Sequence, residues 1–148
     1  MIGRLVALAA IVVALPVEAR PRHDSYDAPT DTHVELVVGL WHDDALALGE
    51  GWHLYHFTAV TSGYVAFQMR SPRDADTLWP YVRIVDRSES WAGVGNRRTN
   101  LCEVIVHVER GHRYDVIATS QRNARLGPRD APDAVGVYTI GVVPVALP

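Results

Sequence analysis

The amino-acid sequence predicts an all-β protein, a β-sandwich of about seven or eight antiparallel strands preceded by a signal peptide. Three observations predict this fold. After residue 31, short segments alternate apolar with polar residues, as strands with one buried face do. Clusters of Gly, Pro, Asp, Asn and Ser separate these segments. The 148 residues, 48% apolar and 21% charged, suit a single domain with its own core.

Residues 1–19 have the composition of a secretory signal peptide. Arg4 provides a basic start, an apolar run follows over residues 5–15, and Val17-Glu18-Ala19 is typical of a cleavage site. The apolar run is shorter than the ~20 residues that a membrane-spanning helix needs. We therefore expect cleavage after Ala19, a secreted or periplasmic protein, and no membrane span after cleavage.

Residues 20–31 are polar, include two prolines and show no periodicity, so they are expected to form an exposed leader. The β-sandwich domain is expected over residues 32–148, with a short C-terminal tail. Residues 32–40 form the first predicted strand, and residues 41–50 are expected to be a turn or a single loose helical turn.

The segments 52–58 and 64–70 are expected to pair as a hairpin across the turn at Ser62-Gly63. Alternation places one set of side chains of these two segments toward the core: His53, Tyr55, Phe57, Val65, Phe67 and Met69. Ala66 and Gln68 are expected to face outward.

Four more strands are predicted over residues 81–86, 101–108, 113–119 and 136–142. The intervening segment 91–100, with two glycines, is expected to be an irregular edge, and residues 120–134 a loop. The predicted core combines the inward positions of all these strands: Tyr55, Phe57, Val65, Phe67, Val82, Ile84, Val104, Val106, Val116 and Ile140.

Cys102, the single cysteine, cannot form an intrachain disulfide, and we expect it to be a small core residue or, alternatively, to form an intermolecular disulfide.

Five short motifs follow one another in a recognisable order along the chain. They are Tyr55-His56-Phe57-Thr58, Gly63-Tyr64-Val65, Asp74-Ala75-Asp76, Gly111-His112-Arg113-Tyr114-Asp115-Val116 and Gly136-Val137-Tyr138-Thr139-Ile140. This order resembles the bacterial pre-peptidase C-terminal (PPC) domain family, a secreted jelly-roll sandwich. The resemblance implies a noncatalytic module of the kind that accompanies secreted peptidases, here standing alone. The chain departs from the family at two places. Trp79-Pro80 interrupts the approach to the following strand, and Arg87-Ser88-Glu89 stands where the family usually turns at a glycine.

Composition and motifs exclude several classes of function. The net charge of −3 and the lack of a long basic run argue against a nucleic-acid partner. The sequence contains no H-E-x-x-H, paired C-x-x-C, G-x-S-x-G or P-loop motif. His53 and His56 lie three apart in a predicted strand, so they point to opposite faces. We therefore expect neither an enzyme nor a cofactor.

The predicted ligand-binding residues are Trp79 and Trp91, which lie in irregular segments, and Tyr81, which begins a predicted strand. Such side chains, like those of Trp41 and Trp52, stack on sugar rings or anchor protein partners. The alternative is that they cover the ends of the core.

Asp74, Asp76 and Asp86 are candidate calcium ligands, because carboxylate oxygens suit Ca²⁺. The alternative is that these Asp side chains stabilise turns of a loop that binds no metal. The absence of the D-x-D-x-D-G spacing of a calcium loop favours this alternative.

These observations predict a secreted or periplasmic noncatalytic module that binds an extracellular polysaccharide or a partner protein. A structural subunit of the cell envelope, assembling through an exposed sheet edge, is the first alternative. A small secreted hydrolase is the second. A cluster of exposed tryptophans favours binding, and a cleft that holds a histidine–carboxylate pair near a nucleophile favours an enzyme.

Overall fold

The computed structural model describes residues 30–47, 50–72, 78–87, 89–96, 98–126 and 135–146. The predicted signal peptide, most of the predicted leader, Asp74 and Asp76 lie outside these residues. Within the described ranges, no helix has both the length and the apolar character needed to cross a membrane.

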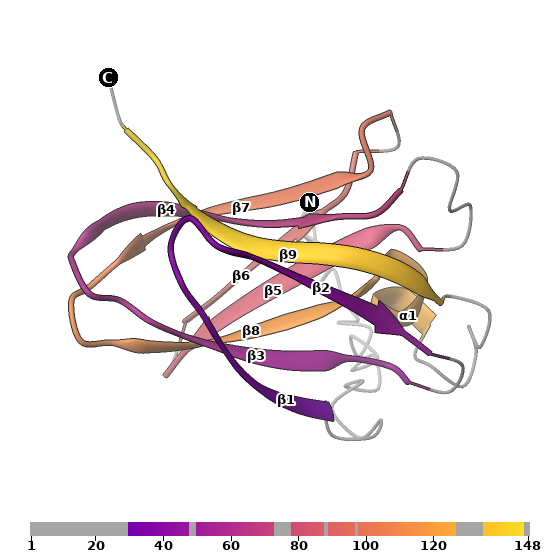
Figure 1. Ribbon diagram of the computed structural model, residues 1–148, viewed down its shortest axis with the longest axis horizontal. Helices are drawn as coiled ribbons and strands as arrows, with labels where there is room; N and C mark the ends of the chain where they lie inside the picture. Colours follow the sequence, from indigo (N-terminus) through magenta and orange to yellow (C-terminus); the bar gives the residue numbers. More distant parts are fainter. Residues whose placement is uncertain are drawn as a thin grey trace, which may run out of the picture.

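Two β-sheets pack face to face, as Figure 1 shows, which confirms the predicted β-sandwich. The five-stranded sheet has the order β1-β3-β8-β5-β6, and the four-stranded sheet has the order β2-β9-β4-β7. The elements are β1 (Thr30–Leu36), β2 (Trp41–Leu46), β3 (His53–Thr58), β4 (Gly63–Arg70), β5 (Pro80–Asp86), β6 (Glu89–Val94), β7 (Leu101–Val108), β8 (Arg113–Ser120), α1 (Gln121–Leu126) and β9 (Gly136–Pro144). The strands pair antiparallel except for β1, which runs parallel to β3.

The core lies between the two sheets and contains all ten residues predicted for it, each no more than 7% exposed. Phe57 of β3 and Phe67 of β4 meet across the layers, with ring centroids 5.3 Å apart and planes at 88°. Cys102 is fully buried, and burial raises the pKa of its thiol to about 11. It is therefore a protonated core residue, as predicted.

The predicted hairpin between residues 52–58 and 64–70 is wrong. β3 pairs with β1 and β8 in one sheet, whereas β4 pairs with β7 and β9 in the other. Ala59 explains the divergence, because its backbone exchanges hydrogen bonds with the turn at Gly111 and His112 and so holds the end of β3 beside β8. The chain then crosses to the opposite layer at Gly63, whose φ of 148° suits glycine.

Three predicted irregular segments contain regular structure. Residues 41–46 form β2 instead of a turn, residues 89–94 form the edge strand β6, and the predicted loop after residue 120 begins with α1. β2 was missed because its inward face carries His42 and Asp44 beside Leu46, and polar inward residues hide the alternation. Ala66 and Gln68 do face the outer side of the sheet, but both are buried, at 1% and 8% exposure.

Of the four edge strands, β6, β7 and β1 are covered or irregular. At one side β6 lies against β7, and an added Cβ at Gly93 would come within 3.0 Å of the Glu103 carbonyl oxygen. At the other side the register of β1 shifts between Asp31 and Glu35, and His33 has a φ of 56°. Both features hinder the addition of a further strand.

Candidate binding site

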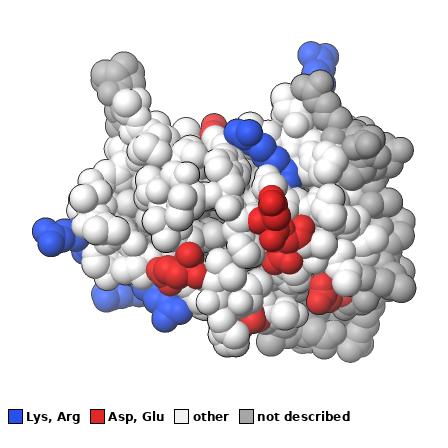
Figure 2. Space-filling model, viewed as in Figure 1, with Lys and Arg blue, Asp and Glu red and all other residues white. Residues whose placement is uncertain are grey.

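The outer face of the four-stranded sheet carries large exposed side chains. Trp41, Tyr64, Ile105 and Val137 are exposed by 42%, 41%, 50% and 56%, and each lies on a different strand of this sheet. Figure 2 views the molecule from the side where β2 and β9 lie in front and shows uncharged residues over most of that surface. Exposed apolar and aromatic side chains gathered on one face are typical of surfaces that bind a partner.

Trp41 packs against the sheet at a position where the neighbouring strand has a glycine. Trp41 lies opposite Gly141, and an added Cβ at Gly141 would be 2.9 Å from two carbons of the indole. The guanidinium carbon of Arg70 lies 4.6 Å from the centroid of the same ring, a cation–π contact. A glycine inside a strand marks such close approaches, so Gly141 was the signal in the sequence that could have identified Trp41.

Arg70 is held in place by a line of hydrogen bonds across the sheet. Its Nη2 donates to Gln68 Oε1 at 3.0 Å, and Gln68 Nε2 donates to the carboxylate of Glu103 on β7. Gln68 also lies opposite Gly141 in the register of β4 and β9. The row therefore runs from Glu103 through Gln68 and Arg70 to Trp41, and it orients the aromatic and cationic groups before any ligand arrives.

A groove of about 630 Å³ adjoins Arg70 at the end of the same sheet. Asp43, Arg70 and Thr139 give it polar side chains, and Ala45 and Val137 give it apolar surface. Its volume falls within the ~300–1,000 Å³ of small-molecule sites in proteins. The groove therefore combines acceptors, donors and apolar surface beside an exposed tryptophan.

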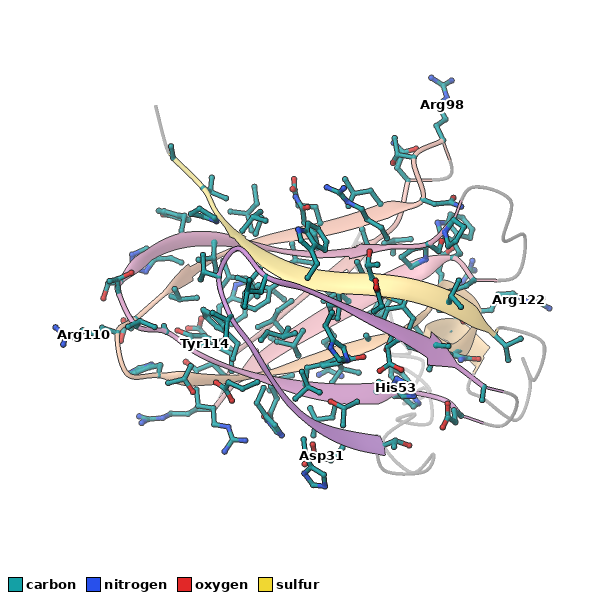
Figure 3. All side chains as sticks on the ribbon, in the orientation of Figure 1. Asp31, His53, Arg98, Arg110, Tyr114 and Arg122 are labelled. Carbon is teal, nitrogen blue, oxygen red and sulfur yellow. The ribbon has the colours of Figure 1, made fainter. Side chains whose placement is uncertain are left out.

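A polar cluster lies inside the sandwich, directly beneath β2 and β9. The Tyr55 hydroxyl donates to Asp44 Oδ2 and lies 2.6 Å from the Tyr138 hydroxyl, which lies 2.8 Å from His53 Nδ1. His53 Nε2 faces Glu50 Oε2 at 3.2 Å. Figure 3 labels His53 at the start of β3, near β2. The cluster joins β2 and β9 of one sheet to β3 of the other and so stabilises the wall of the groove.

The pKa values of this cluster follow from its burial and its hydrogen bonds. Burial is the largest cause that raises the pKa of Tyr55 and of Tyr138, and the nearby Asp44 raises both further, so both hydroxyls stay protonated. Burial also acts to raise the pKa of Asp44. Hydrogen bonds from Tyr55 and from the Ala45 N–H, with the nearby His53, outweigh burial and hold that pKa below its usual value. Asp44 is thus an anion that accepts from protonated neighbours.

The three aromatic residues predicted to bind ligand do not share one surface. Trp91 lies opposite Ile84 and packs inward against the core, whereas Tyr81 lies opposite Val94 on the outer face of the five-stranded sheet. The Trp79 indole donates a hydrogen bond to the Gly95 carbonyl oxygen. Their role in binding stays a prediction.

Of the predicted calcium ligands, only Asp86 lies in the described part of the chain. Its carboxylate faces His112 Nδ1 at 3.5 Å, and His112 Nε2 faces Glu109 at 3.3 Å. Asp86 and Trp91 line a common cavity of about 510 Å³. Among the residues that the structure describes, no three His, Cys, Asp or Glu side chains converge in a way that would hold a metal ion.

A further cavity, of about 620 Å³, opens on the outer face of the five-stranded sheet. There His56 lies between Asp115 and Asp31, at 3.0 and 3.2 Å from its two ring nitrogens. Asp31 is labelled at the start of β1 in Figure 3. The described residues that line this cavity include histidine–carboxylate pairs but no serine, threonine or cysteine. The arrangement that would favour a hydrolase with a side-chain nucleophile is therefore not assembled by those residues.

Comparisons with known proteins place the fold. No protein-family model matches the chain, and no curated protein matches its sequence. The pre-peptidase C-terminal domain of a collagenase from Bacillus anthracis is similar in structure, with a TM-score of 0.57, 11% identity, and coverage of 78% of this chain and 97% of that domain. CorA, a surface-associated copper-binding protein of Methylomicrobium album BG8, is similar with a TM-score of 0.53, 7% identity, and coverage of 82% and 100%. The chain therefore has a β-sandwich fold like that of a pre-peptidase C-terminal domain.

Proposed function

We propose that this protein is a noncatalytic binding module that works outside the cytoplasm and holds an extracellular macromolecule on the outer face of its four-stranded sheet. The observation that carries the proposal is the exposed Trp41 indole, which packs over Gly141 and against Arg70, a residue that lines the groove. Tryptophan and arginine are the side chains that most often dominate binding energy at interfaces.

The arrangement of these side chains favours binding because it is largely formed in advance. Arg70 is fixed by Gln68 and by the Trp41 ring, so less side-chain freedom is lost when a ligand binds. The polar cluster around Asp44 supports the same strands from beneath. An envelope subunit that assembles through sheet edges would have to use β2, because β6 covers the edge beside β7 and β1 is irregular.

The proposed location rests on the composition of residues 1–19. We expect the protein isolated from its host to begin at Arg20, and N-terminal sequencing measures this directly. Recovery of the chain with Met1 intact in the membrane fraction would contradict export by cleavage.

The binding proposal is tested by retention of host macromolecules. The purified protein, immobilised on a resin, should retain a polysaccharide or protein from the host's extracellular extract, and Trp41→Ala should weaken that retention by at least about tenfold in affinity. Trp91→Ala is the matched control, because Trp91 packs inward at the opposite sheet. Retention lost in Trp79→Ala or Trp91→Ala but unchanged in Trp41→Ala would move the site to the residues predicted from the irregular segments.

A further inference from the structure

We infer that the groove beside Arg70 binds a neutral sugar unit of an extracellular polysaccharide. This inference rests on the proposed function and names its ligand class. The groove crosses β2, β9 and β4, and its described lining residues are Asp43, Asp44, Ala45, Arg70, Ser71, Pro72, Val137, Tyr138 and Thr139.

The charges around the groove favour an uncharged ligand with many hydroxyl groups. Exposed Asp43 offers carboxylate oxygens that only accept hydrogen bonds, and exposed Arg70 offers N–H groups that only donate. Thr139 can do either. A sugar hydroxyl both donates and accepts, so one ring satisfies all three groups at once. Asp43 and Asp44 would repel a strongly anionic ligand, and Arg70 would repel a strongly cationic one.

The apolar part of the groove suits the C–H face of a sugar ring. Ala45 and Val137 lie opposite one another on β2 and β9, and Val137 is 56% exposed. Beyond Arg70, Trp41 offers an aromatic surface on which a neighbouring sugar unit of the same chain can pack. A polysaccharide therefore uses both features, whereas a single small molecule would use only the groove.

Strand pairing argues against a peptide that adds along β9, the middle strand of the groove, although not against one that adds at the edge strand β2. Peptides that bind to sheets usually add a strand at a free edge through backbone hydrogen bonds. Here the central strand β9 is paired on both sides, with β2 over residues 41–46 and with β4 over residues 65–70. The backbone groups of β9 along the groove are thus engaged in the sheet, and recognition falls to side chains.

The test is titration calorimetry of the purified protein with neutral hexasaccharides derived from cellulose, xylan, mannan and chitin, and with oligogalacturonate as the anionic probe. We expect at least one neutral hexasaccharide to bind and oligogalacturonate to bind more weakly. Asp43→Asn and Arg70→Ala should each reduce the affinity for the neutral probe by about tenfold or more. Asp115→Asn, an exposed carboxylate on the opposite sheet, is the matched control and should leave the affinity unchanged.

Thermal unfolding of each variant checks that it is folded, and Thr139→Val provides a second variant that keeps the shape of the side chain. Neutral probes that do not bind, while Trp41-dependent retention of a host protein persists, would overturn the sugar inference and leave the proposed function standing. Binding that is indifferent to Asp43→Asn and Thr139→Val, or that prefers oligogalacturonate, would also overturn the inference. Absence of any Trp41-dependent retention would instead overturn the proposed function.

Discussion

Replacing Phe67 with alanine should lower the free energy of unfolding by about 3–5 kcal/mol, the range observed when a large buried ring is removed from a packed core. Phe67 is fully buried in β4 and packs edge to face on Phe57 of β3. It therefore joins the two sheets, and the cavity left by its removal lies between layers that strand pairing keeps apart. Equilibrium denaturation by urea measures the change.

Ile105→Ala is a suitable control for Phe67→Ala. Ile105 lies on the adjacent strand β7 but is 50% exposed on the outer face of the sheet. Its replacement should cost far less, near the ~0.5 kcal/mol typical of surface substitutions. Equal losses in the two variants would contradict the placement of the core between the sheets.

Replacing Asp44 with alanine should be the next most damaging change. The Tyr55 hydroxyl would lose its carboxylate acceptor, and the network that includes Tyr138 and His53 would be broken. A buried polar group left without a partner costs about 1–3 kcal/mol. Because more than one group loses a partner, the expected loss of stability is larger than that of a single hydrogen bond. Asp43→Ala, one residue away on the opposite face of β2, is the control and should change stability little.

The same carboxylate predicts a dependence of stability on pH. The pKa of Asp44 is lower in the folded protein than its usual 3.8, so its contribution is present above pH 3.8 and is lost as the pH falls through the folded-state value. The difference in thermal midpoint between the wild-type protein and Asp44→Asn should therefore shrink on acidification below this pH. A difference that stays constant down to strongly acidic pH would show that Asp44 stabilises by shape alone.

The strands were predictable where one face is apolar and the other polar. Leu101–Val108 alternates along its whole length and forms β7 at the predicted residues. The pairing of the strands was harder to predict. The apolar faces of β3 and β4 are equally compatible with a hairpin and with two strands in opposed sheets. The backbone contacts of Ala59 with the turn at Gly111 decide between them, and such contacts leave no trace in periodicity.

The candidate site was only partly predictable, for a related reason. Trp79 and Trp91 are predicted to bind ligand because they interrupt the alternation, yet Trp91 packs on the core and the Trp79 indole donates a hydrogen bond to the Gly95 carbonyl oxygen. Trp41 lies in a segment whose strand character is hidden by Asp44, a half-buried polar residue that faces inward and accepts a hydrogen bond from Tyr55. Where polar side chains satisfy one another in the interior, a search for apolar periodicity misses both the strand and the outer face that it presents.

Tryptophan resonances test the location of the binding site most directly, because the chain has four tryptophans and Trp41 lies on the proposed binding face. When ¹⁵N-labelled protein is titrated with the macromolecule that it retains from the extracellular extract, the Trp41 indole N–H and the backbone amides of β2 and β9 should shift. The indole signals of Trp79 and Trp91 should stay in place. Shifts confined to Trp79, Trp91 and the five-stranded sheet would contradict a binding site on the four-stranded sheet.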